Sequence, residues 1–289
     1  MTPMRLLHPM DNDALFCLVH QAQKGNEENN MKKWQNGAVV AALMFSILAT
    51  GCGEKIDQTA SVEVTTTTAL ETPTEAPTEA PELTERAKKL LAQNPDTVGY
   101  ITISGTQVDN PVVQTVDDEY YLDHGFDGQE FRAGTVFMDC TDVFGADPAA
   151  WSENIILYGH NMADNTMFGS LRRYRQDPSY YKEAPFITFS SNYADYTYVI
   201  FGLIITGGDA DSDFLYWNME ELDDKATFDS YVNSVEAKNM IDNPLDVQFG
   251  DSILTLSTCY SDEDNSRFLV VARRLRDGED TDTLLATIQ

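Results

Sequence analysis

The chain has few residues that can act as nucleophiles, proton carriers or soft metal ligands. It contains four histidines and four cysteines in 289 residues. No Cys-x-x-Cys or His-x-x-x-His spacing occurs, and no acidic run has the spacing of a calcium loop. We therefore expect no metal and no cofactor. Beyond the first 84 residues, the only candidates of these two types are His124, His160, Cys140 and Cys259.

Basic residues are also scarce. The chain carries 19 lysines and arginines against 47 aspartates and glutamates, a net charge of −28. Proteins that bind nucleic acid need a basic surface to contact phosphates, so this composition argues against a nucleic-acid partner. We interpret the acidity as a well-solvated surface. The length and the 42% hydrophobic content suffice for one large or two small domains.

The N-terminal apolar segment is too short for an ordinary membrane-spanning helix. It covers residues 37–49, whereas a span needs roughly 20 residues. A short basic head precedes it, as in a secretory signal. Cys52 then follows small residues, as in a lipoprotein processing site, which would make it the lipidated N-terminus. Residues 31–52 are thus a signal peptide with a lipobox or an uncleaved signal anchor, and residues 1–30 a mis-assigned start or a disordered extension.

The next segment, residues 53–84, reads as a linker. It is rich in threonine, proline and glutamate, and such a chain stays extended and solvated because it cannot bury a core. It would space a folded domain, residues 85–289, from a membrane. These features predict a protein at the extracytoplasmic face of the cell membrane, attached through its N-terminal lipid or anchor.

The folded domain is predicted to be mostly β. Residues 83–93 favour a helix, which Asn94-Pro95 ends. Eight short apolar runs bounded by turn residues suggest a closed barrel or a sandwich. Two inserts have helical character, at residues 166–174 and 219–239. The expected strands are 98–103, 109–114, 135–138, 155–158, 186–189, 196–205, 252–258 and 268–274.

The last two expected strands carry the strongest functional signal. Cys259 ends the first and Arg267 begins the second, with a polar loop between them. In a hairpin, this arrangement sets a nucleophilic thiol opposite a cation that can hold an oxyanion. His160 follows another buried-looking strand and Gly159. A cysteine with a distant histidine is a candidate catalytic pair, although an inert buried thiol and a hydrogen-bonded histidine remain the alternative.

Several motifs, in this order along the chain, resemble the sortase family and its class B in particular. The resemblance covers roughly residues 85–276. The motifs shared with sortases are Tyr-Gly-His-Asn-Met at 158–162, Leu-Ser-Thr-Cys at 256–259 and an arginine, Arg267, on the following strand. Those typical of class B are Val-Asp-Asn-Pro-Val-Val-Gln at 108–114, Tyr-Tyr-Leu at 120–122, Gly-Thr-Val-Phe-Met-Asp at 134–139, and the segment 167–174.

The resemblance implies a mostly β fold. It is a sortase-like eight-stranded barrel with an N-terminal helix and a long helical insert before the cysteine strand. That insert, residues 219–239, would wall a substrate groove or simply cover the barrel.

The resemblance also implies a cysteine transpeptidase and endopeptidase. Cys259 would attack a threonine carbonyl in a C-terminal sorting motif of a secreted protein, Asn-Pro-x-Thr-like or Ser/Pro-Pro-x-Thr-Gly-like. His160 would be the general acid and base, and Arg267 would hold the carbonyl or its oxyanion. An amine of peptidoglycan or of a pilin would accept the thioacyl group. We expect the enzyme to act as a monomer.

Further site residues and rival functions follow from the same motifs. Tyr158, Ser257 and Thr258 are candidates to line the site, although Ser257 could instead be a serine that lines the barrel. We expect Cys140 and His124 to be non-catalytic. One rival is an inactive sortase-like lipoprotein that acts as a surface binding module. Another is a different cell-wall cysteine peptidase. The His-Gly-Cys-x-Arg string of L,D-transpeptidases is absent, and papain-like enzymes place the cysteine before the histidine, the reverse of the order here.

Overall fold

A computed structural model describes residues 81–208, 211–218, 222–260 and 265–289. The predictions for residues 1–30, 31–52 and most of 53–84 therefore lie outside the described residues. Within the described ranges, every helix falls short of the length and apolarity that crossing a bilayer requires.

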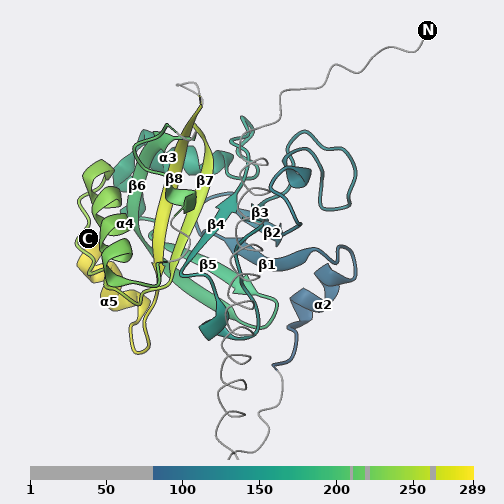
Figure 1. Ribbon diagram of the computed structural model, residues 1–289, viewed down its shortest axis with the longest axis horizontal. Coiled ribbons are helices and arrows are strands. Elements are labelled where there is room, and N and C mark those ends of the chain that lie inside the picture. The colour runs from purple at the N-terminus through teal and green to yellow at the C-terminus, as the bar shows by residue number, and fades with distance from the viewer. Residues whose placement is uncertain (1–80, 209–210, 219–221, 261–264) are drawn as a thin grey trace, which may run out of the picture. The chain divides into compact units, whose positions relative to one another are not determined.

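The described residues fold around a closed barrel of eight strands, which confirms the expected fold (Figure 1). The order around the barrel is β1-β2-β3-β4-β7-β8-β6-β5, closing back on β1. The strands are β1 Thr97–Thr102, β2 Asp109–Val113, β3 Phe137–Met138, β4 Asn154–Tyr158, β5 Phe186–Ser191, β6 Asp195–Gly207, β7 Ile253–Tyr260 and β8 Ser266–Arg274.

Two neighbouring pairs in this order determine where the candidate residues lie. β4 and β7 are parallel, with Tyr158 opposite Ser257, so their carboxyl ends meet at one edge of the barrel. β7 and β8 form an antiparallel hairpin in which Cys259 is opposite Arg267. The three chain segments that carry His160, Cys259 and Arg267 therefore come together at this edge.

The barrel interior is apolar, and one side of its outer surface is covered by a helix. Side chains on β1 alternate between buried and half-buried, as expected for a strand with one face to the core. β6 is buried along most of its length because α4, Lys225–Lys238, packs on its outer face (Figure 1). Gly202 on β6 leaves the room that this packing needs, since a Cβ there would lie 2.6 Å from Val235 Cγ1 of α4.

The helices differ from expectation at their starts, for local reasons. α4 begins after Asp224, whose carboxylate caps the backbone N–H groups of Ala226 and Thr227, so the predicted start at residue 219 was wrong. The predicted helix at 166–174 begins only at residue 169, because Asn165 and Met167 adopt positive φ angles of 69° and 50°. The helices are α2 Glu85–Leu91, α3 Arg172–Gln176, α4, and α5 Thr281–Ile288, with 3-10 turns η1 Tyr120–Leu122, η2 Pro148–Ala150, η3 Gly169–Leu171, η4 Pro178–Lys182 and η5 Tyr216–Asn218.

β3 is shorter than the sequence predicts. The expected strand began at Thr135, but its backbone N–H donates to Tyr121 O, away from the barrel, at 3.0 Å. Gly134 has a φ of 59°, and a Cβ there would clash with the backbone of Tyr121 and Leu122. This close approach brings the segment around η1 against the end of β4, next to His160.

Candidate active site

One pocket at the carboxyl edge of β4 and β7 brings the predicted catalytic residues together. Cys259 has a free thiol and is exposed at the end of β7. His160 follows β4 by two residues, and Arg267 lies on β8. The residues that line the pocket are Asp118, Leu122, Phe137, Tyr158, Gly159, His160, Ser257, Thr258, Cys259 and Arg267.

The imidazole of His160 is held by the segment that precedes β3. Its Nε2 lies 2.6 Å from the backbone carbonyl oxygen of Leu122. A carbonyl oxygen can only accept, so Nε2 carries the proton in this hydrogen bond. Nδ1 is then the ring nitrogen left to exchange protons in the pocket. The hydrogen bond to one ring nitrogen thus fixes the orientation of the imidazole and leaves the other nitrogen available for proton transfer.

The guanidinium of Arg267 enters the pocket from β8 and packs against a glycine. A Cβ on Gly208 would lie 2.7 Å from Cζ and 2.8 Å from Nη1 of Arg267. Gly208 is itself fixed, because its N–H donates to Asn265 O at 2.7 Å. The end of β6 therefore offers a bare peptide surface against which the arginine lies.

Tyr158 and Ser257 line the pocket while their hydroxyls are engaged elsewhere. The Tyr158 hydroxyl donates to Asp139 Oδ2 at 2.9 Å. Burial, followed by the nearby Asp139 carboxylate, raises the pKa of the Tyr158 phenol well above its usual value, so it stays protonated. Ser257 Oγ lies 2.7 Å from the hydroxyl of Tyr216, which belongs to η5, just before the predicted insert. Thr258, the third predicted lining residue, is also in the pocket wall and is 4% exposed.

The insert contacts the site indirectly. Among the described residues, the pocket takes none of its lining from α4. α4 packs on the barrel instead, and its Tyr231 hydroxyl bonds Thr255 Oγ1 of β7 at 2.8 Å. Of the two roles expected for this insert, covering the barrel is the one its contacts support. The 3-10 turn η5, which precedes the predicted insert, contacts the cysteine strand through the Tyr216 hydroxyl and Ser257 Oγ.

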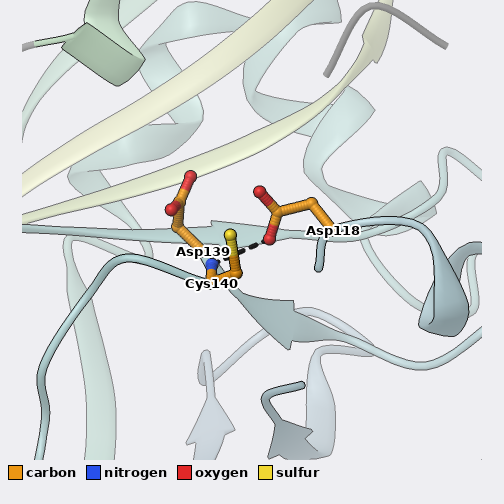
Figure 2. Close-up of side chains that lie close together, drawn as sticks. All are labelled: Asp118, Asp139 and Cys140. Carbon is orange, nitrogen blue, oxygen red and sulfur yellow. Dashed lines mark hydrogen bonds between the residues drawn. The ribbon is translucent and has the colours of Figure 1, made fainter. Parts of the chain in front are cut away.

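Three potential metal ligands gather beside the pocket, at the end of β3, and one of them, Asp118, also lines the pocket. Ligand atoms of Asp118, Asp139 and Cys140 lie within 4.8 Å of one another, and Figure 2 shows the Cys140 sulfur between the two carboxylates. Asp118 Oδ1 accepts from the Cys140 N–H at 2.8 Å, and Asp139 accepts from Thr141 N–H and from Tyr158. These hydrogen bonds link the cluster to the loop that follows β3 and to Tyr158 of β4.

The two residues expected to be non-catalytic lie away from the pocket. Within the described part of the chain, neither Cys140 nor His124 lines it. The His124 ring stacks on Tyr120 with 4.1 Å between ring centroids, and its Nδ1 lies 2.6 Å from Asp123 Oδ1. These contacts give His124 a role within its own turn.

The barrel and the pocket with its cysteine, histidine and arginine define a protein of the sortase type. A family model, the Sortase domain, matches residues 101–275, and the chain belongs to this family. Its relatives are of class B. Sortase B of Listeria monocytogenes is 32% identical over 185 residues, which cover 63% of this chain and 70% of the relative.

Solved structures of class B sortases have the same fold. An X-ray structure of Clostridium perfringens sortase B is 28% identical, with a TM-score of 0.58, over 65% of this chain and 99% of that one. A Staphylococcus aureus sortase B–substrate complex is also 28% identical, with a TM-score of 0.59, over 68% of this chain and 87% of that one. The suspected membership of class B is thus confirmed.

Some pocket residues were not anticipated from the sequence as site residues. Leu122 and Phe137 lie in motifs that carried the class B resemblance, but nothing in those motifs showed that they face the thiol. Asp118 lies two residues before the Tyr-Tyr-Leu motif at 120–122. All three residues belong to the early segment 108–139, which contacts β4 only once the barrel is closed.

Proposed function

We propose that this protein is a sortase B-like cysteine transpeptidase. It cleaves a C-terminal sorting motif of secreted proteins and transfers the acyl fragment to an amine. The observation that carries the proposal is the single pocket lined by Cys259, His160 and Arg267. A nucleophile, a proton carrier and a fixed cation are the three groups that acyl transfer through a thioester requires.

The reaction runs in two halves. The Cys259 thiolate attacks the threonine carbonyl of the motif, and Arg267 holds the negative charge that develops on the carbonyl oxygen. The C–N bond breaks as His160 gives a proton to the leaving amine. In the second half an acceptor amine attacks the thioester, His160 takes its proton, and the C–S bond breaks to restore the thiolate and the protonated imidazole. Water can replace the amine, which gives peptide hydrolysis.

The substrate class rests on the relatives. A sortase B of Staphylococcus aureus has been solved in complex with a substrate. For this chain we infer a polypeptide with an Asn-Pro-x-Thr-like or Ser/Pro-Pro-x-Thr-Gly-like motif. The acceptor amine belongs to peptidoglycan or to a pilin lysine.

The proposed setting is the extracytoplasmic face of the cell membrane. Lipidation of Cys52 or an uncleaved signal anchor at 31–52 would hold the chain there, and the Thr/Pro/Glu-rich linker would space the barrel from the bilayer. We infer that the enzyme works there as a monomer.

The full chain tests the activity with a panel of quenched peptides bearing each motif, with and without diaminopimelate or oligoglycine as acceptor. Cleavage of one motif class, and a ligated product when the acceptor is present, is expected. Cys259→Ala should abolish both. His160→Gln retains an N–H that can reach Leu122 O but removes the titrating ring, so it should fold and show no turnover. If no peptide is cleaved although the Cys259 thiol is reduced and titratable, the transpeptidase is refuted in favour of a binding module.

A further inference from the structure

The backbone carbonyl of Cys259 is held by a side chain from the loop that carries His160. The Gly159 N–H donates to Ser257 O at 3.2 Å, which extends the parallel β4–β7 ladder past the end of β4. Carbonyl groups two residues apart on a strand point to the same side, so the Cys259 carbonyl also faces β4. A longer β4 would offer it the backbone N–H of Asn161. The chain turns away instead, and Asn161 Nδ2 donates to Cys259 O at 3.0 Å.

The orientation of the Asn161 amide is fixed from its other end. Arg172, at the start of α3, donates through Nη2 to Asn161 Oδ1 at 3.1 Å. The same guanidinium donates to the backbone carbonyls of Met162 and of Gly169. A guanidinium can only donate, so the amide oxygen must face Arg172, and the amide N–H groups must face Cys259. Arg172 thus holds the loop 161–169 together, and Asn161 then links this loop to β7.

We propose that Asn161 is a positioning residue for acyl transfer, a role that rests on the proposed function. Its side-chain amide takes the place of the missing ladder hydrogen bond and fixes the backbone of Cys259 relative to the loop that carries His160, one residue earlier. The thiol and the imidazole come from strands that are distant in sequence, and this contact couples their positions. A displacement of about 1 Å between reacting groups can lower a rate by about 100-fold.

Three variants of the full chain test this role. Asn161→Asp keeps an oxygen for Arg172 but replaces the donor with an acceptor that repels the Cys259 carbonyl. Asn161→Ala removes the contact without adding charge. Asn165→Asp is the matched control, because it adds the same charge to the same loop at a φ of 69°, which aspartate tolerates. Among the described residues, no hydrogen bond joins the Asn165 side chain to Cys259.

Both changes at Asn161 are expected to lower kcat for peptide cleavage by about 10- to 100-fold with KM unchanged, while Asn165→Asp stays at the wild-type value. The pH profile of Cys259 alkylation by iodoacetamide should shift in Asn161→Ala, which a purely structural role would leave in place. Wild-type kcat and an unchanged alkylation profile in both Asn161 variants would overturn the proposal, and so would an equal loss of kcat in Asn165→Asp.

The alkylation profile separates this proposal from the proposed function. A wild-type protein that cleaves no peptide, but whose Cys259 alkylation profile still depends on Asn161, would refute the transpeptidase and support the positioning contact. An active wild type together with an Asn161→Asp variant of unchanged kcat would support the transpeptidase and refute the positioning role of Asn161.

Discussion

A buried chain of hydrogen bonds ties helix α4 to the strand that ends in the proposed nucleophile. The Thr255 hydroxyl donates to Asn154 Oδ1 at 2.8 Å, so its oxygen accepts from the Tyr231 hydroxyl, also at 2.8 Å. All three residues are 0% exposed. Thr255→Val removes the central oxygen while keeping the side-chain shape. We predict that this change destabilises the protein and that Tyr231→Phe partly reverses the loss.

The magnitude follows from which groups lose a partner. Thr255→Val deprives the Tyr231 donor and the Asn154 acceptor of this partner, at about 1–3 kcal/mol each. Tyr231→Phe alone removes one hydrogen bond, for about 1 kcal/mol, since Thr255 keeps its bond to Asn154. In the double variant no tyrosine hydroxyl is buried there. The double variant should therefore lose less stability than the two single losses added together, by about 2–4 kcal/mol, because only Asn154 is left without this partner.

Urea denaturation of the four proteins in the cycle, with midpoint and slope both fitted, measures this coupling. An unchanged slope allows the midpoints to be compared directly as free energies of unfolding. Additive effects, with a coupling energy below about 0.5 kcal/mol, would refute the hydrogen-bond chain as drawn. The kcat for peptide cleavage, measured on the same proteins, shows whether loosening α4 is felt at Cys259.

Gly208→Ala should lower kcat by about 100-fold, because a Cβ there would meet the Arg267 guanidinium at 2.7 Å and displace the group proposed to hold the oxyanion. Gly207→Ala is the control in the same peptide-cleavage assay, since its Cβ would meet Ser212 instead; equal losses in the two variants would contradict this explanation. The hydrogen bond from buried Arg273 lowers the pKa of Glu279 below its usual 4.5, so its stabilising contribution is full above about that pH and is lost as the pH falls through the lowered value. Thermal melts should show Glu279→Gln less stable by about 3 kcal/mol at neutral pH, with a shallower fall on acidification than wild type; parallel pH curves would contradict the assignment.

The elements that the sequence predicts well are those with strong local patterns. β7 and β8 are runs rich in aliphatic and β-branched residues with a polar loop between them, so the opposition of Cys259 and Arg267 could be expected from hairpin geometry alone. The N-terminal helix also has its local signals, with Thr84 capping it and Asn94-Pro95 beyond its end. In each case neighbouring residues supply both the signal and the contact.

The contacts around His160 depend on pairings that local patterns do not contain. Parallel pairing of β4 with β7 joins segments about a hundred residues apart, and only this pairing explains why Asn161 meets the Cys259 carbonyl. Leu122 reaches the imidazole because Gly134 lets two segments approach closely. An asparagine or a leucine in a loop carries no periodic signal. Its role becomes visible only when the barrel is closed.

Trapping the acyl-enzyme tests the central claim most directly. The full chain is mixed with a peptide that bears the preferred sorting motif, quenched in acid, and examined by intact mass and peptide mapping. The account predicts a mass increase equal to the acyl fragment, located on Cys259, removed by hydroxylamine and lost in Cys259→Ala. Cleavage of the peptide with no adduct on Cys259, or with an adduct that persists in Cys259→Ala, would contradict it.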